Sequence, residues 1–179
     1  GVQVHGGMGF IEETGAARLL RDARIAPIYE GTNGIQAIDL VTRKLSQSGG
    51  EHITGYIDEL KDIAAQVAGK NSPEFGLTAD RLKSALSDLT EATGWLLQAL
   101  QNGRMAEALA GATPYQRLFG LAAGATYLAK GALVETGDDS ARIALCRFCA
   151  ENMLAETAAL RDAVMHGSTS LLGARAALK

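Results

Sequence analysis

Aromatic residues and proline are scarce in this 179-residue chain. Aromatic side chains make up 5% of the residues, and only three prolines occur. Strands draw heavily on aromatic and β-branched residues, whereas alanine and leucine, which are abundant here, are strong helix formers. The composition therefore predicts an all-α fold.

No charge of one sign and no long apolar run dominates the chain. The formal net charge is −3, so no electrostatic field favours nucleic acid or an anionic lipid surface. No apolar run approaches the roughly 18 residues of a membrane-spanning helix. We therefore expect neither a nucleic-acid partner nor a membrane span.

Cysteine is limited to Cys146 and Cys149. Three residues apart in a helical pattern, the two side chains share one helix face. A redox pair would favour a loop or a helix start, and a zinc site would need two further ligands. We expect two small core residues and no metal site.

The chain begins at Gly1 rather than Met, without a signal-like segment, and we expect it to be cut from a longer protein. The stretch SQSGGEH, residues 46–52, is the best candidate for a linker. We therefore predict two domains, residues 1–48 and residues 49–179.

Apolar side chains recur at steps of three and four residues through most of the chain, which predicts helices packed into an antiparallel bundle. The expected apolar face of a helix at about 33–46 comprises Ile35, Ile38, Val41 and Leu45. The faces expected further on comprise Ile53, Ile57, Leu60, Ala64 and Val67, then Leu82, Leu86, Leu89, Thr93, Leu96 and Leu100, then Tyr115, Leu118, Ala122, Ala125, Ala129 and Ala132, and finally Cys146, Cys149, Met153, Thr157, Leu160 and Val164.

Two stretches near the N-terminus have both structural and functional interpretations. In QVHGGMGF, the adjacent Gly6 and Gly7 would let backbone N–H groups approach a ligand such as a phosphate, although the stretch also suits an ordinary turn. In LLRDARI, Asp22 beside Arg21 and Arg24 predicts buried or half-buried ion pairs that orient helices.

A third stretch, IYEGTNGIQ at residues 28–36, places Glu30 on a turn beside apolar residues. A carboxyl group held among apolar groups has its charged form disfavoured, so its pKa rises and it suits the role of general base. By spacing alone, Glu30 could equally be a plain turn residue.

Taken in order, Q-x-x-G-G-x-G-[FY], R-D-A-[RK]-I and I-Y-E-G-T-x-x-I-Q resemble the C-terminal end of acyl-CoA dehydrogenases over residues 1 to about 45. The resemblance implies a flavoprotein that uses FAD to oxidise acyl-CoA to trans-2-enoyl-CoA. Glu30 would remove the α-proton, and its backbone N–H would donate to the thioester carbonyl. Gly31 would lie against the substrate.

The resemblance also implies two groups of FAD contacts. The residues expected at the adenosine diphosphate end, across a subunit interface, are Gln3, Val4, His5, Gly6 and Gly7. Those matching the flavin-contacting turn are Thr32, Asn33 and Gly34, where many members have a larger polar or acidic residue in place of Gly34.

The same resemblance implies a homodimer or homotetramer, an electron-transfer flavoprotein as acceptor and a location in the bacterial cytoplasm. Residues 50–179 are similar to the C-terminal extension of a bacterial subgroup that includes 3-methylmercaptopropionyl-CoA dehydrogenase. As a fragment, the chain should be inactive alone. Two alternatives remain: a helical assembly or interaction module, and an acyl-CoA oxidase.

Overall fold

The computed structural model describes residues 1–70, 72–135 and 140–177, and within these ranges every regular element is helical. The predicted all-α fold is therefore confirmed. The chain forms two compact units, residues 1–36 and residues 37–179, and the division falls inside helix α3, Thr32–Asp39. The predicted domain boundary after residue 48 stays a prediction. No helix of the described ranges is both long and apolar enough to cross a membrane.

The first unit is built from short helices. These are α1 (Gly7–Phe10), a 3₁₀ turn (Glu12–Thr14), α2 (Ala16–Arg24) and the start of α3. The ion pairs of this unit differ from the prediction. Arg21 donates two hydrogen bonds to Glu12, at 3.0 and 2.6 Å, and Asp22 lies 3.6 Å from Arg18; all four side chains are exposed. The expected burial is wrong because α2 has no buried residue in this unit.

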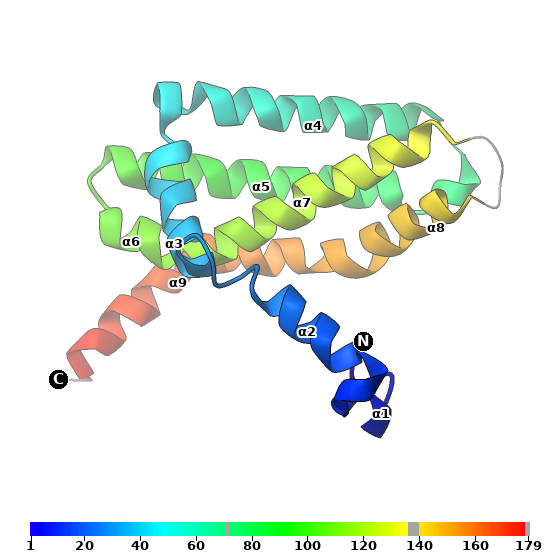
Figure 1. Cartoon of the computed structure of the whole chain (residues 1–179). Helices are drawn as coiled ribbons and strands as arrows, with labels where there is room; N and C mark the ends of the chain where they lie inside the picture. The colour runs from blue at the N-terminus through cyan, green and yellow to red at the C-terminus, as the bar shows by residue number, and fades with distance from the viewer. Residues whose placement is uncertain (71, 136–139, 178–179) are drawn as a thin grey trace. The chain divides into compact units, whose positions relative to one another are not determined.

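The second unit is an antiparallel helical bundle, as predicted. Successive long helices run in alternate directions (Figure 1). The long helices are α4 (Glu51–Lys70), α5 (Thr78–Gln101), α7 (Ala112–Leu133) and α9 (Thr157–Ala177), and the shorter ones are α6 (Met105–Ala110) and α8 (Ala141–Phe148). Helix α5 ends at Asn102–Gly103, where Gly103 has φ +71°. Glycine suits such a left-handed helix end.

Helix α7 forms the centre of the bundle and contacts α4, α5, α8 and α9. Its predicted apolar face is buried throughout. Most of that face is alanine, whose single methyl group lets neighbouring helix backbones come close. The residues of the face are Tyr115, Leu118, Ala122, Ala125, Ala129 and Ala132.

Two π-helical turns shift the buried faces away from the predicted ones. The first, Leu40–Lys44, continues α3 and ends with a bond from the Leu45 N–H to the Leu40 carbonyl at 2.8 Å. The residues buried there are Ala37, Val41 and Leu45, whereas Ile35 and Ile38 are exposed. A π turn has more than 3.6 residues, so the side chains before it and after it do not share the face that α-helical spacing predicts. Val41 and Leu45 are buried as predicted, whereas Ile35 and Ile38, which precede the π turn, are not.

The second π turn, Cys149–Met153, lies between α8 and α9 and has the same effect. It exposes Met153, which the periodicity assigned to the core, and buries Leu154 instead. Cys146, Cys149, Thr157 and Val164 are buried as predicted.

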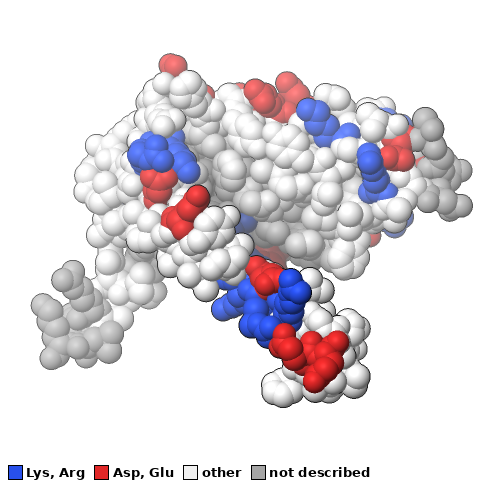
Figure 2. Space-filling view, viewed as in Figure 1, with Lys and Arg blue, Asp and Glu red and all other residues white. Residues whose placement is uncertain are grey.

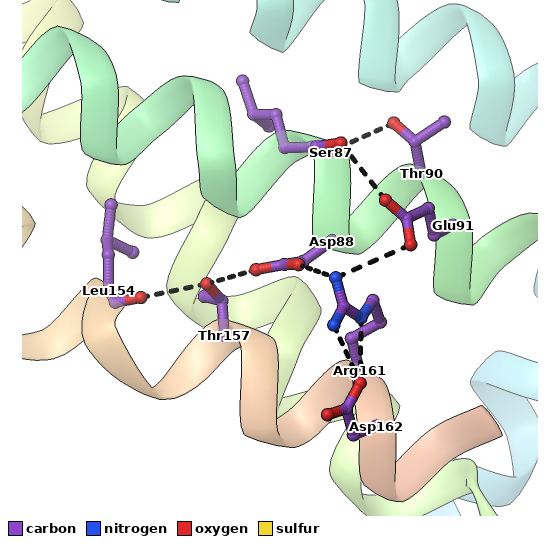
Figure 3. A network of polar contacts seen from close by, with 9 residues as sticks. Ser87, Asp88, Thr90, Glu91, Leu154, Thr157, Arg161 and Asp162 are labelled. Carbon is purple, nitrogen blue, oxygen red and sulfur yellow. Dashed lines mark hydrogen bonds and ion pairs between the residues drawn. The ribbon is translucent and has the colours of Figure 1, made fainter. Parts of the chain in front are cut away.

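A buried carboxylate joins α5 to α9. Asp88 is only 6% exposed and accepts one bond from Thr157 Oγ1 and another from Arg161, both at 2.8 Å (Figure 3). Arg161 also contacts Glu91 at 3.6 Å and Asp162 at 2.8 Å. Of the three carboxylates near the Arg161 guanidinium, only that of Asp88 lies in the bundle interior. The positive charge of Arg161 thus compensates the buried negative charge of Asp88.

We expect Arg161→Met to lower the melting temperature of the protein, because it leaves the buried Asp88 charge without its cationic partner. Arg117→Met is the matched control, since Arg117 pairs with Glu156 at 2.8 Å between two exposed side chains. Exposed pairs typically contribute less than about 1 kcal/mol. Equal melting temperatures for the two variants would contradict this account of Asp88.

Candidate functional site

The turn that carries Glu30 has an unusual backbone. Glu30, Gly31 and Thr32 have φ values of 55°, 94° and 56°, so three consecutive residues lie in the left-handed region. That region suits Gly31 but disfavours Glu30 and, more strongly, the β-branched Thr32. Such a conformation costs about 1–3 kcal/mol for each non-glycine residue, and strain of this kind clusters at functional sites.

Hydrogen bonds from both sides hold the turn. The Thr32 N–H donates to the Ile28 carbonyl and the Asn33 N–H to the Pro27 carbonyl, each at 3.2 Å. The Gln36 side-chain amide donates to the Glu30 carbonyl at 2.6 Å. Within the described ranges, the N–H groups of Glu30 and Gly31 donate to no other residue. Two backbone donors therefore stay available beside the carboxylate.

The space around position 31 also favours glycine. A Cβ built there would lie 3.1 Å from Cγ2 of Ile35, in addition to the left-handed backbone. The turn therefore brings main chain, rather than a side chain, next to the Glu30 carboxylate.

Apolar side chains surround the turn but do not enclose it. Glu30 is exposed, and Ile28, Tyr29 and Ile35 are 56%, 55% and 54% exposed. Glu30 thus has the apolar neighbours that the sequence predicted, but within residues 1–36 neither Glu30 nor these neighbours are buried. Thr32, Asn33 and Gly34 form the exposed first turn of α3.

The residues from Gln3 to Gly7 form a glycine-containing turn that leads into α1. Gly6 has φ +57°, and a Cβ at Gly6 or Gly7 would meet nothing within 4 Å, so the backbone is open to a ligand. Gln3, Val4 and His5 are exposed, and His5 Nδ1 lies 3.0 Å from the Gly1 carbonyl. An amide, an imidazole and approachable backbone form a donor set that fits the phosphate and ribose oxygens of FAD.

The turn at Gln3–Gly7 and the turn at Glu30–Gly34 remain separate in this structure. Among the described residues, no hydrogen bond or ion pair joins them. Each group is contiguous in sequence, so each is formed locally.

Charges of both signs are interspersed around these elements. On the face that Figure 2 shows, acidic and basic side chains of the described residues both occur, and neither sign covers the face. The closest carboxylate–guanidinium pair of the first unit is Glu12–Arg21, and the hydrogen bonds from Arg21 hold the pKa of Glu12 below its ordinary value.

Gln36 is a residue whose contact the sequence did not reveal. Gln36 is the last residue of the I-Y-E-G-T-x-x-I-Q pattern. The sequence alone does not indicate that its side chain, six residues after Glu30, contacts the Glu30 carbonyl. The contact arises because the turn folds back against the start of α3.

The two cysteines lie in the core of the bundle. Burial, followed by the neighbouring Cys149, raises the pKa of Cys146 to about 11, although a hydrogen bond with Thr78 opposes this. Burial also raises the pKa of Cys149. Both thiols are therefore protonated at neutral pH, as expected of core residues.

In the described part of the chain, no cluster of three or more histidine, cysteine or acidic residues could hold a metal ion.

Two family models match the chain. The model described as "Acyl-CoA dehydrogenase, C-terminal domain" matches residues 1–45, and the model described as "Acetyl-CoA dehydrogenase C-terminal like" matches residues 56–175. The second match alone covers more than half of the residues. The chain belongs to the acyl-CoA dehydrogenase family.

Individual relatives agree with this assignment. The chain is 37% identical to 3-methylmercaptopropionyl-CoA dehydrogenase of Ruegeria pomeroyi over 97% of its own length and 31% of that protein. It is 38% identical to a butyryl-CoA dehydrogenase of Syntrophomonas wolfei over 48% of its length and 14% of that protein. It is also 43% identical to the rat mitochondrial very long-chain specific acyl-CoA dehydrogenase, over 37% of its length and 10% of that protein.

The first of these matches supports the expected subgroup, because it extends through the bundle as well as the Glu30 turn. The chain spans about a third of the length of this relative and less of the other two.

We expect the native chain to react slowly with a thiol reagent at pH 7 and both cysteines to react rapidly after denaturation, since the thiolate is the nucleophile. Because folding raises the pKa of Cys146 from 9.0 to about 11, the unfolded state loses its proton first. The free energy of unfolding should therefore fall as the pH rises through this window. Rapid labelling of two thiols in the native protein would contradict their burial.

Proposed function

We propose that this chain is the C-terminal part of an FAD-dependent acyl-CoA dehydrogenase that oxidises acyl-CoA thioesters to trans-2-enoyl-CoA. The observation that carries the proposal is the turn at residues 30–32. It presents a carboxylate and two available backbone N–H groups on a left-handed backbone, within a segment that matches the family's C-terminal domain.

In this proposal, Glu30 is the general base that removes the α-proton of the thioester. An α-proton beside a thioester is far too weak an acid for a carboxylate in water, so the developing negative charge on the thioester carbonyl must be stabilised. The N–H of Glu30 donates to that oxygen, since a preorganised backbone donor stabilises charge as it develops. Gly31 lets the substrate approach the main chain.

The exposed apolar side chains around the turn have a role in the same scheme. The side chains of Ile28, Tyr29 and Ile35, exposed in this chain, become covered when the acyl chain of the substrate and the other domains of the intact enzyme lie against them. Removing water from this surface strengthens the hydrogen bonds that the backbone N–H groups of the turn donate to the thioester carbonyl.

Gln3, Val4, His5, Gly6 and Gly7 would hold the adenosine diphosphate end of FAD, and Thr32, Asn33 and Gly34 would lie against the flavin. Bound FAD supplies the acceptor for the β-hydrogen, which leaves as hydride. The Gln3–Gly7 turn serves a neighbouring subunit in a homodimer or homotetramer, and an electron-transfer flavoprotein receives the electrons. Taken alone, the chain neither holds FAD well nor turns over.

The test uses the intact flavoprotein that contains this chain, mixed anaerobically with a panel of acyl-CoA thioesters while the flavin absorbance is followed. We expect fast bleaching by at least one thioester and, in Glu30→Gln, a rate lower by at least about a hundredfold. Glu59→Gln is the control, because Glu59 is an exposed carboxylate on α4. Bleaching that survives in Glu30→Gln would assign the base to another residue.

A second candidate function concerns the bundle, which could act in assembly. The observation that favours it is the exposure of large apolar side chains on the described bundle surface, including Val134 (74%) and Phe148 (59%). Contiguous exposed apolar patches occur at protein interfaces, and this candidate requires such side chains to be part of one. Deleting residues 50–179 from the intact protein would then change its oligomeric state, measured by sedimentation, and leave flavin bleaching intact.

A further inference from the structure

We infer that Gln36 is a positioning residue that aims the Glu30 carboxylate and backbone by holding the Glu30 carbonyl with its side-chain amide. The inference rests on the proposed function, since it assigns Gln36 a role in the work of Glu30.

The contact itself is short and well placed. Gln36 Nε2 lies 2.6 Å from the Glu30 carbonyl oxygen. Gln36 is half-buried, whereas residues 28 to 35 around the turn are exposed, so its side chain is more confined than its neighbours. It projects from the second turn of α3, which makes the start of that helix the support for the turn.

The carbonyl that Gln36 holds belongs to the peptide group joining Glu30 to Gly31. The orientation of this peptide is set by ψ of Glu30 and φ of Gly31, and it fixes the direction of the Gly31 N–H, one of the two available donors, relative to the Glu30 side chain. Because Gly31 readily adopts both signs of φ, this peptide could reverse at little cost if nothing held it.

The other bonds of the turn do not restrain this peptide. The Thr32 and Asn33 N–H groups bond back to Ile28 and Pro27, which secures the chain on either side of it. Within the described residues, no donor other than Gln36 reaches the Glu30 carbonyl. Gln36 is therefore the specific restraint on the peptide next to the base.

The experiment compares Gln36→Leu with the wild type in the intact flavoprotein, using the acyl-CoA that bleaches the flavin fastest. We expect normal flavin content and melting temperature, with a bleaching rate at saturating substrate that is about 10- to 100-fold lower, because small misplacements of a reacting group have effects of this size. The concentration for half-maximal rate should change much less. Gln66→Leu is the matched control, since Gln66 is an exposed glutamine on α4.

An isotope effect distinguishes positioning from structural damage. With substrate deuterated at the α-carbon, a misaimed base makes proton removal more rate-limiting, so the isotope effect on bleaching should exceed that of the wild type. Loss of a fraction of active protein would lower the amplitude of bleaching and leave the isotope effect unchanged. Wild-type bleaching rate and isotope effect in Gln36→Leu would overturn the inference.

Two further variants decide the matter if Gln36→Leu does not fold. Gln36→Lys keeps a donor of sufficient length, whereas Gln36→Asn keeps the amide but is one methylene too short. Faster bleaching in Gln36→Lys than in Gln36→Asn supports the inference, and equal rates overturn it. A wild type that no acyl-CoA bleaches would reject the proposed function itself, whereas bleaching that requires Glu30 but is indifferent to Gln36 would reject only the role of Gln36.

Discussion

The close approach of helices around the alanine face of α7 is the constraint on which the bundle depends. Ala122, Ala125 and Ala129 are buried where α7 meets its neighbours, and α7 contacts α4, α5, α8 and α9. A methyl group at each position sets short distances between helix axes. Larger side chains would force those axes apart and strain the packing of the surrounding leucines.

The helix that begins at the Glu30 turn also belongs to this core. Its start, at Thr32, carries the strained backbone, and its continuation through the first π turn buries Val41 and Leu45 in the cluster that contains α7. A strained turn persists only if its surroundings over-determine it. Within residues 1–36, the Gln36 side chain supplies part of that determination by a direct hydrogen bond to the Glu30 carbonyl.

The two units place different demands on their residues. In the bundle, buried polar groups such as Thr93 with Tyr115 and Asp88 with Thr157 find partners within the chain, whereas Glu74 Oε2 is buried without one. In residues 1–36, apolar side chains and backbone donors are left exposed around both glycine-containing turns. The second pattern is typical of a surface that ligand and protein partners cover, whereas the first is typical of an interior that is complete in itself.

The sequence by itself determined the helical class, the antiparallel bundle and most of its buried positions, because helical periodicity is a local property of residue order. It also determined the family, because the three motifs that carry the resemblance are contiguous stretches within residues 1 to about 45. The tertiary structure alone decided where that periodicity breaks. Packing selected the π turns that bury Ala37 and Leu154 in place of Ile38 and Met153, at a local cost that no spacing rule reveals. The left-handed run at residues 30–32 and the Gln36 contact are local, yet residue spacing does not reveal them, because both depend on how the turn folds back onto α3.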